Sequence, residues 1–252
     1  MTPSALAQKL KPYSDSPMLE ARWILDEVQN EKKILNILKR RQKGEPLSKI
    51  LRHKGFWKGD FITSKDVLDP RSDSETLIEA VLKTLPNKSV PYSFVDIGTG
   101  SGCLLISLLM EYKKAKGVGL DLSEDALKIA KKNALKNGVK AQFVKKDMCT
   151  LNDSFDFAIS NPPYIPTKVI EKLEENVRSY DPVAALDGGI DGLDYYRVLS
   201  RIQSIPLLFL EIGKGQKTAV CRLFQKTGWR LLSAHKDLGK IIRVLVFQKK
   251  DL

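Results

Sequence analysis

Short apolar runs alternate with amphipathic segments over the second half of the chain, between residues 94 and 247. The apolar runs have the length of buried strands, and several of the segments between them repeat their apolar residues at helical spacing. We predict strands over residues 94–97, 118–120, 142–144, 155–159, 207–212, 230–234 and 241–247. We predict helices after residue 102, over residues 126–138 and over residues 216–226. This alternation predicts an α/β fold, a mostly parallel sheet with helices on both faces.

The last two predicted strands are joined by residues 235–240 alone. This link is too short to hold a crossover helix, so the two strands should form an antiparallel pair. A parallel sheet of seven strands that includes an antiparallel strand favours a methyltransferase over a nicotinamide dehydrogenase.

The first 50 residues show helical spacing without strands. Thr2 before Pro3, Ser16 before Pro17, and Asn30 have the character of helix starts, and Gly44 follows the third helix. Nothing in this segment resembles catalytic chemistry. We therefore predict that residues 1–50 form a helical substrate-docking domain, in which the basic residues at positions 39, 40, 41 and 43 attract an acidic partner.

The segment that follows predicts a connector. Aromatic residues flank the turn Lys58-Gly59-Asp60, which favours a β-hairpin linker over residues 51–69. Ser72 with Glu75 three residues later is the pattern of a capping box, and it predicts that a helix begins there. Residues 70–252 would then form the methyltransferase domain.

Composition limits the partners. The formal net charge of +12 over 252 residues favours an acidic partner, although lysines on solvated helix faces would give the same charge. Three widely spaced cysteines and two isolated histidines predict neither a disulfide framework nor a metal site. No apolar run is long enough to span a membrane, and residues 1–16 lack the apolar core of a signal peptide. We expect a cytoplasmic protein without a metal, and a monomer as the simplest state.

A glycine-rich loop joins the first predicted strand of the sheet to its helix. It consists of Asp96, Ile97, Gly98, Thr99, Gly100, Ser101 and Gly102. Its glycines let the backbone approach a ligand at a helix N-terminus, but the dinucleotide fingerprint would need a glycine at Cys103. The spacing suits S-adenosylmethionine, which has no pyrophosphate and whose cationic amino end favours the nearby carboxylate of Asp96.

Two more aspartates end the next two predicted strands. Asp121 is placed to accept hydrogen bonds from both ribose hydroxyls, and Asp147 to accept from the adenine amine, with Met148 against the ring. Each aspartate alone could be a helix N-cap. Three of them at the ends of successive strands, beside a glycine loop, indicate a cofactor site.

The sequence Asn161-Pro162-Pro163-Tyr164 follows the fourth predicted strand of the sheet. Its prolines fix the backbone, so carbonyl groups are held rigidly at the carboxyl end of the sheet, where open α/β folds bind ligands. The Asn161 amide oxygen and a fixed carbonyl could hold both N–H bonds of a planar NH2 group and direct its lone pair toward an electrophile. The alternative is a rigid turn without chemistry.

At this point the chain resembles the HemK/PrmC family of protein-(glutamine-N5) methyltransferases that modify peptide chain release factors. The resemblance covers nearly the whole chain. Its motifs are Glu45-Pro46-Leu47, Asp69-Pro70-Arg71-Ser72-Asp73-Ser74-Glu75, residues 96–102, residues 160–165, Asp181-Pro182, residues 185–189, Asp191-Gly192-Leu193, Tyr196-Arg197, Leu210-Glu211-Ile212-Gly213, Asp237-Leu238-Gly239 and Arg243. In this family the fold is that of a class I S-adenosylmethionine-dependent methyltransferase, Rossmann-like, with a small N-terminal helical domain.

The resemblance implies a substrate and roles for residues. The substrate would be the glutamine of the Gly-Gly-Gln motif of release factors, gripped by Asn161 and the Pro162 carbonyl, with Pro163 and Tyr164 shaping the pocket. Residues 98–102, Asp121 and Met148 would bind S-adenosylmethionine, which leaves as S-adenosylhomocysteine, and Asn161 would also touch the cofactor. Ser74 stands where threonine is expected, and Met148 where tryptophan is common, so adenine stacking should be weaker.

Two alternatives stay open. A nucleic-acid amino-methyltransferase acting on adenine N6 or guanine N2 would use the same Asn-Pro-Pro-Tyr sequence on a flipped base. The positive charge favours it, but no part of the chain is left over for a recognition domain, and we expect no stable nucleic acid partner. A catalytically silent binding module is disfavoured because the glycine loop and the amide grip are both intact.

Overall fold

The computed structural model describes residues 1–250, apart from the side chain of Asn176. Its main sheet has seven strands in the order β5-β4-β3-β6-β7-β9-β8. The strands are β3 (Ser93–Ile97), β4 (Lys116–Asp121), β5 (Gln142–Lys145), β6 (Phe157–Ser160), β7 (Leu207–Glu211), β8 (Trp229–Lys236) and β9 (Ile242–Lys249). Strands β3 to β7 are parallel, whereas β9 pairs antiparallel with both β7 and β8. All seven predicted strands and the antiparallel pair are confirmed.

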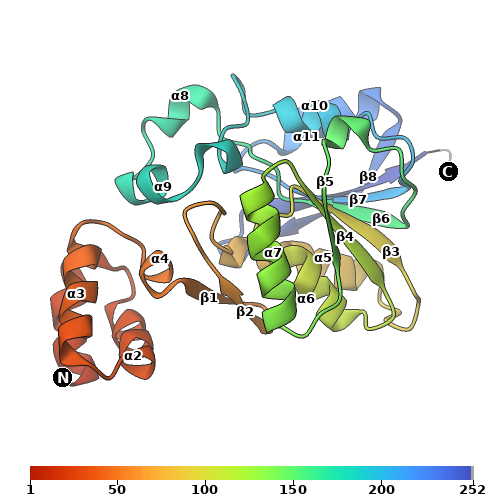
Figure 1. Ribbon diagram of the computed structural model, residues 1–252. Coiled ribbons are helices and arrows are strands. Elements are labelled where there is room, and N and C mark those ends of the chain that lie inside the picture. Colours follow the sequence, from red (N-terminus) through yellow and green to blue (C-terminus); the bar gives the residue numbers. More distant parts are fainter. Residues whose placement is uncertain (251–252) are drawn as a thin grey trace.

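Helices cover both faces of this sheet (Figure 1). One face packs against α5 (Glu75–Thr84), α6 (Cys103–Glu111) and α7 (Glu124–Lys136), and the other against α10 (Asp194–Leu199) and α11 (Lys217–Lys226). Strand β3 shows why two layers of helices are needed. Phe94 is buried in the first cluster and Val95 in the second, because successive side chains of a strand point to opposite faces.

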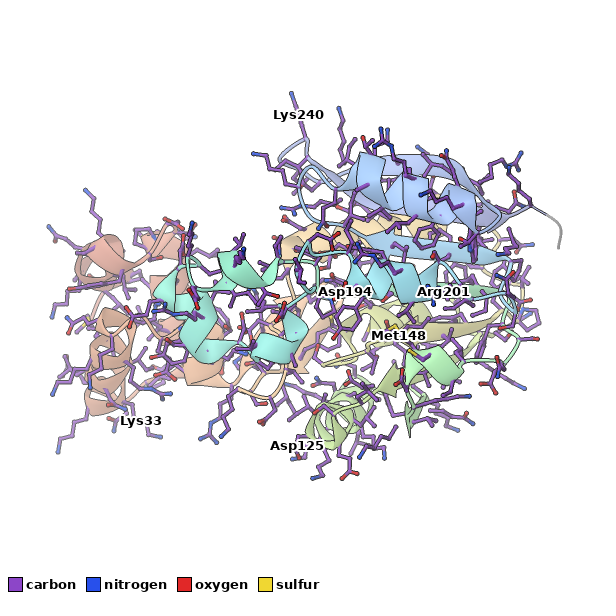
Figure 2. All side chains as sticks on the ribbon, turned by 90° about the horizontal axis from the view of Figure 1, so that it is seen from above. Lys33, Asp125, Met148, Asp194, Arg201 and Lys240 are labelled. Atoms are coloured by element: carbon purple, nitrogen blue, oxygen red, sulfur yellow. The ribbon has the colours of Figure 1, made fainter. Side chains whose placement is uncertain are left out.

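The connections after β6 carry short helices. These are α8 (Thr167–Ile170) and α9 (Glu175–Tyr180), with a 3₁₀ turn at Val183–Ala185. Three further 3₁₀ turns lie earlier in the chain, at Lys11–Tyr13, Ser72–Ser74 and Met148–Thr150. Helices α8 and α9 extend from the sheet toward the N-terminal helices (Figures 1 and 2). Within residues 1–250, no helix is long and apolar enough to cross a membrane.

The N-terminal helices have a hydrophobic cluster of their own, set apart from the sheet (Figure 1). They are α1 (Pro3–Leu10), α2 (Pro17–Glu27), α3 (Glu31–Gln42) and the short α4 (Leu47–Leu51). Thr2 and Asn30 cap α1 and α3 as predicted, since their side chains accept from the backbone N–H groups of Ala5 and Lys33. Ser16 makes no such bond at the start of α2.

The basic cluster predicted at the end of α3 is not a free docking patch. Arg41 is buried; its guanidinium donates to the Glu20 carboxylate at 2.9 and 3.0 Å and to the Tyr13 carbonyl at 2.6 Å. Arg40 pairs with Glu45. Arg41 therefore joins α3 to α2, and Arg40 pairs with the loop that follows α3, which leaves Lys39 and Lys43 exposed.

The predicted hairpin is present as β1 (His53–Phe56) and β2 (Gly59–Ile62). Asn133 on α7 and Asn137, the residue directly after this helix, bind the free edge of β2. Asn133 accepts from the Ile62 N–H at 2.6 Å, and Asn137 accepts from the Asp60 N–H at 3.1 Å and donates to its carbonyl at 2.9 Å. Side-chain amides thus take the place of a neighbouring strand, and the hairpin is fastened to the body of the sheet domain.

The predicted capping box is wrong. Residues Ser72–Ser74 form a 3₁₀ turn, and α5 begins at Glu75 without a side-chain cap. The Glu75 carboxylate accepts instead from the backbone N–H of Trp57, at the tip of the hairpin, at 2.7 Å. A tertiary hydrogen bond has replaced the local one.

Candidate functional site

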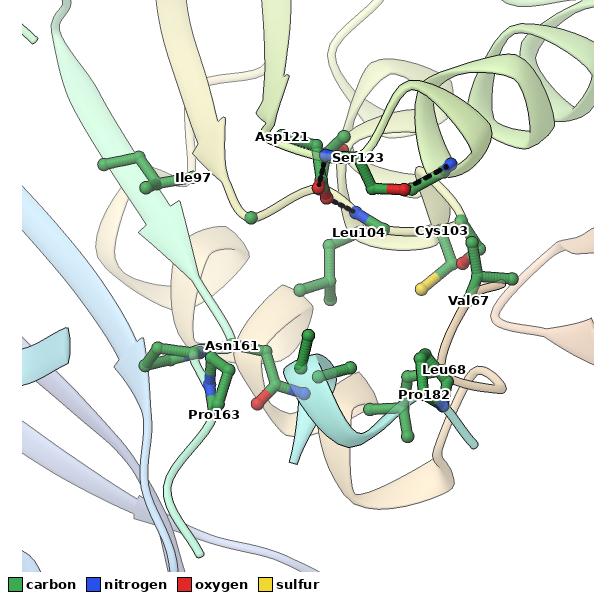
Figure 3. Close-up of a pocket in the computed structure, with 18 of the residues that line it drawn as sticks. Val67, Leu68, Ile97, Cys103, Leu104, Asp121, Ser123, Asn161, Pro163 and Pro182 are labelled. Atoms are coloured by element: carbon green, nitrogen blue, oxygen red, sulfur yellow. Dashed lines mark hydrogen bonds between the residues drawn. The ribbon is translucent and has the colours of Figure 1, made fainter. Parts of the chain in front are cut away.

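A cavity of about 280 Å³ opens at the carboxyl ends of β3, β4 and β6. Figure 3 shows Asp121 and Ser123 on one side of it, Asn161 and Pro163 on another, and Val67, Leu68 and Pro182 opposite. The topology explains this placement. The carboxyl ends of parallel strands meet at one edge of the sheet, which is where open α/β folds bind ligands.

The glycine loop forms one wall of the cavity. Gly98 and Gly100 have φ values of 75° and 53°, a region that side chains disfavour, and a Cβ atom added to either would meet no atom within 4 Å. Both glycines, with Thr99 and Ser101, line the cavity. Gly102 serves packing, because a Cβ there would lie 3.2 Å from that of Ala130. The loop therefore offers bare backbone to a ligand.

Asp96 lies beneath this loop and is not among the residues that line the cavity. Its carboxylate is buried and accepts from the Thr99 hydroxyl at 2.7 Å. Burial raises its pKa to about 7, against the lowering effect of the Thr99 hydrogen bond. Asp96 thus supports the loop through Thr99, while its Oδ1 has no hydrogen-bond partner among the described residues, and its contact with the cofactor's amino group stays a prediction.

Asp121 lines the cavity at the end of β4. Its Oδ2 accepts from the Gly100 N–H and its Oδ1 from the Ser123 N–H, both at 2.9 Å (Figure 3). Ser123, and not Asp121, is the N-cap of α7, since its Oγ accepts from the Ala126 N–H at 3.2 Å. The carboxylate is thus aimed at the cavity by two backbone donors, and the alternative that Asp121 only caps the helix is excluded.

Met148 and Lys146 line the same end of the cavity, whereas Asp147 between them does not. Asp147 caps the 3₁₀ turn that follows, where its Oδ1 accepts from the Cys149 N–H at 2.8 Å. Asp147 therefore has a local capping role, and Met148 is the residue of this pair that lines the cavity.

The Asn-Pro-Pro-Tyr segment supplies the wall facing the glycine loop. Asn161, Pro162 and Pro163 line the cavity, and the Asn161 Nδ2 donates to the Ser74 Oγ at 3.1 Å. Among the described residues, neither Asn161 Oδ1 nor the Pro162 carbonyl accepts a hydrogen bond. Tyr164 lies behind this wall, packed against the second core cluster, and burial raises its pKa to about 12. Two of the predicted acceptors are thus free, and the tyrosine supports the wall from behind.

Sequence reasoning missed the remaining wall. It is formed by Val67, Leu68, Pro182 and Tyr195. A buried ion cluster beside it joins the two segments involved. Lys49 Nζ lies 2.8 Å from Asp69 Oδ1 and 3.1 Å from Asp181 Oδ1, and Arg71 donates to the other oxygen of Asp181 at 2.6 Å. The only sequence signal was the crowding of charges around Pro70.

These residues fit S-adenosylmethionine. The bare glycine backbone leaves room for a ligand, the Asp121 carboxylate can accept from a diol, and Met148 offers an apolar contact to a base. Within residues 1–250, no group of three or more histidine, cysteine, aspartate or glutamate side chains is placed to hold a metal ion.

Comparison with known proteins decides the family. Residues 60–176 match the model of the methyltransferase small domain. The release factor glutamine methyltransferase of Caulobacter vibrioides is 42% identical over 224 residues, which cover 85% of this chain and 77% of the relative. The release factor glutamine methyltransferase of Thermodesulfovibrio yellowstonii is 32% identical over 252 residues, which cover 96% of this chain and 87% of the relative. The chain belongs to the release factor glutamine methyltransferase family.

Membership confirms the resemblance seen in the motifs, and it makes the chain an S-adenosylmethionine-dependent methyltransferase. The fold agrees. The hMettl16 catalytic domain, solved in complex with the MAT2A 3'UTR hairpin 6, aligns with a TM-score of 0.63 over 94% of this chain and 83% of that one, at 13% identity. A likeness at this identity concerns the fold alone.

Proposed function

We propose that this member of the release factor glutamine methyltransferase family transfers a methyl group to the side-chain amide N5 of the glutamine in the Gly-Gly-Gln motif of peptide chain release factors. The names of its relatives support this acceptor over a nucleic acid base. The observation that carries the proposal is the pair of free acceptors, Asn161 Oδ1 and the Pro162 carbonyl, across the cavity from the glycine loop and Asp121.

S-adenosylmethionine, when bound, supplies the electrophilic methyl group. The glycine loop and Asp121 would hold its ribose side, and Met148 would lie against the adenine. Asn161 and the Pro162 carbonyl would accept the two N–H bonds of the glutamine amide. With both N–H bonds held, the nitrogen would be shifted from planar toward tetrahedral geometry with its lone pair directed at the methyl group, and fixed dipoles of this kind need no reorganisation during the reaction. The methyl–sulfur bond would break as the carbon–nitrogen bond forms, and the methylated amide would then release one N–H proton to solvent.

The apolar, proline-rich walls suit this chemistry. Pro162, Pro163 and Pro182 have no N–H to compete for the acceptors, and the apolar side chains of Val67 and Leu68 would limit the access of water to a bound amide. With water excluded, hydrogen bonds from the amide to Asn161 and Pro162 are stronger than they would be in a solvated site.

We further propose that the N-terminal helices dock the release factor, because one glutamine side chain carries too little information to select a protein. Helices α1 to α4 form a separate hydrophobic cluster, which supports a unit with its own surface. The monomeric state and the cytoplasmic location stay predictions.

The experiment that tests the function is transfer of labelled methyl from S-adenosylmethionine to an intact release factor, with RNA and DNA as competing acceptors. The proposal expects label in the release factor alone, at the glutamine of Gly-Gly-Gln. Label in nucleic acid would favour the amino-methyltransferase alternative.

A further inference from the structure

Three side chains from distant parts of the chain meet behind Asn161. Strands β6 and β7 are parallel neighbours in which Ser160 pairs with Leu210, so Asn161 and Glu211 stand side by side at adjacent strand ends. Ser74, in the turn before α5, reaches the same point, and its Oγ accepts from Asn161 Nδ2 at 3.1 Å. The catalytic asparagine is therefore backed by a hydroxyl and a carboxyl group.

The carboxyl group of Glu211 has no role in the proposed reaction, yet it is buried, which costs folding free energy. Glu211 is 2% exposed, and its Oε2 has no hydrogen-bond partner among the described residues. Burial raises its pKa to about 7, while hydrogen bonding from Ser74 and Asn161 and the charge of Arg243 act in the opposite direction. An isolated buried carboxyl group is expensive, so one placed beside a catalytic amide calls for a function.

The hydrogen-bonding capacities of these groups give the network a direction. A carboxylate can only accept, and a serine hydroxyl has one proton to donate. Because Ser74 Oγ already accepts from Asn161 Nδ2, its own proton is left for the Glu211 carboxylate that faces it. The donors then point toward Glu211: Asn161 Nδ2 donates to Ser74 Oγ, and both Ser74 and Asn161 hydrogen-bond to the Glu211 carboxylate.

We propose that Ser74 and Glu211 are positioning residues that fix the orientation of the Asn161 amide. With Nδ2 bound inward, Oδ1 is the atom left to accept from the NH2 group of the substrate. A flipped amide would present one NH2 group to another, and the grip would fail. This inference rests on the proposed glutamine acceptor and adds to it the residues that set the polarity of the grip.

Steady-state kinetics on a Gly-Gly-Gln peptide tests it, with Ser74→Ala, Ser74→Thr and Glu211→Gln compared with the wild type. Ser74→Ala should lower kcat about tenfold, as expected for losing one preorganised hydrogen bond, with the Kd for S-adenosylmethionine nearly unchanged. Ser74→Thr keeps the hydroxyl and should stay within about threefold of the wild type. Glu211→Gln can donate to Ser74 and reverse the chain, so it should resemble Ser74→Ala.

A wild-type kcat for Ser74→Ala would overturn the proposal, as would equal losses in the alanine and threonine variants, since packing alone would then explain them. A second measurement does not depend on the acceptor. The side-chain amide signals of Asn161 in a ¹⁵N spectrum, assigned by their loss in Asn161→Ala, should shift and exchange faster with water in Ser74→Ala. Unchanged signals would contradict the proposal. A wild type that leaves the peptide unmethylated would overturn the proposed function, while the amide signals would still report whether Ser74 holds Asn161.

Discussion

Lys49 Nζ lies 2.8 Å from Asp69 Oδ1, and this buried ion pair connects α4 to a segment that lines the cavity. The same ammonium lies 3.1 Å from Asp181 Oδ1, next to Pro182 in the facing segment, and donates to the carbonyls of Ser64 and Val67. One side chain near the N-terminal helices thus holds both segments of one cavity wall. Its position would couple any movement of those helices to the site.

Replacing Lys49 by methionine should lower the free energy of unfolding by roughly 3–5 kcal/mol, because two buried carboxylates would lose their partner. Denaturant unfolding measures this change. Lys43→Met, at an exposed position, is the matched control and should change stability by less than about 0.5 kcal/mol. A Lys49 variant as stable as this control would mean that the remaining partners suffice, namely the Ser48 hydroxyl, which donates to Asp69, and Arg71, which donates to Asp181.

The second prediction separates ligand binding from helix capping. Asp121→Ala should weaken S-adenosylmethionine binding by roughly 1.5–3 kcal/mol, through loss of charge-assisted hydrogen bonds. Ser123→Ala removes the actual cap of α7 and should cost about 1 kcal/mol of stability while leaving the cofactor Kd nearly unchanged. Calorimetric titration of both variants with S-adenosylmethionine compares their Kd values. The same Kd in both would refute the proposed contact of Asp121 with the ribose.

The third prediction concerns pH. Burial raises the pKa of Asp96 to about 7, above its unfolded value, so the folded protein retains this proton longer than the unfolded chain does. The stabilisation from this group is complete below about pH 4 and is lost as the pH rises through about 7. Asp96→Asn should therefore lessen the decline in stability over this range by an amount on the order of a few kcal/mol. Unfolding curves at several pH values test it, and parallel profiles for both proteins would show that Asp96 ionises normally.

The fourth prediction tests the docking role of α3. Because Arg40 and Arg41 pair with Glu45 and Glu20, Lys39 and Lys43 are the two exposed members of the basic cluster at the end of α3. The double variant Lys39→Glu/Lys43→Glu should slow methylation of an intact release factor severalfold at low salt, and much less at high salt, without affecting a short peptide. Lys131→Glu/Lys132→Glu on α7 makes the same charge change away from these helices. If both double variants slowed methylation of the intact release factor equally, the net charge of the protein would explain the effect without a docking role for α3.

Local sequence was enough to predict those parts of the site that lie within a single loop between a strand and the next element. Gly98 and Gly100 have positive φ values, which favour glycine, and Pro162 and Pro163 restrict the backbone of the turn after β6. The glycine loop and this turn could therefore be predicted from the sequence. The strands were equally visible, because apolar runs of that length bury on both faces of a parallel sheet. The resemblance to a family added the acceptor, which no local pattern contains.

Pairings between distant segments could not be read in this way. Ser74 and Asn161 are 87 positions apart, and nothing near either residue names the other. Glu75 was predicted to belong to a capping box at the start of α5. Its carboxylate accepts instead from the backbone N–H of Trp57, a residue of the hairpin, so a tertiary contact replaces the local one. Asp96 and Asp147 were predicted to contact the cofactor, but neither lines the cavity; one oxygen of Asp96 accepts from the Thr99 hydroxyl and one of Asp147 from the Cys149 N–H.

The grip of Asn161 on the acceptor amide is the central claim, and one measurement tests it most directly. Wild type and Asn161→Ala are incubated with S-adenosylmethionine and an intact release factor, and the Gly-Gly-Gln peptide is analysed by mass spectrometry while calorimetry follows cofactor binding. We predict one methyl group on the glutamine with the wild type. The variant should lose roughly a hundredfold or more in rate while still binding the cofactor. Methylation of the glutamine by Asn161→Ala at a rate near that of the wild type would contradict the account.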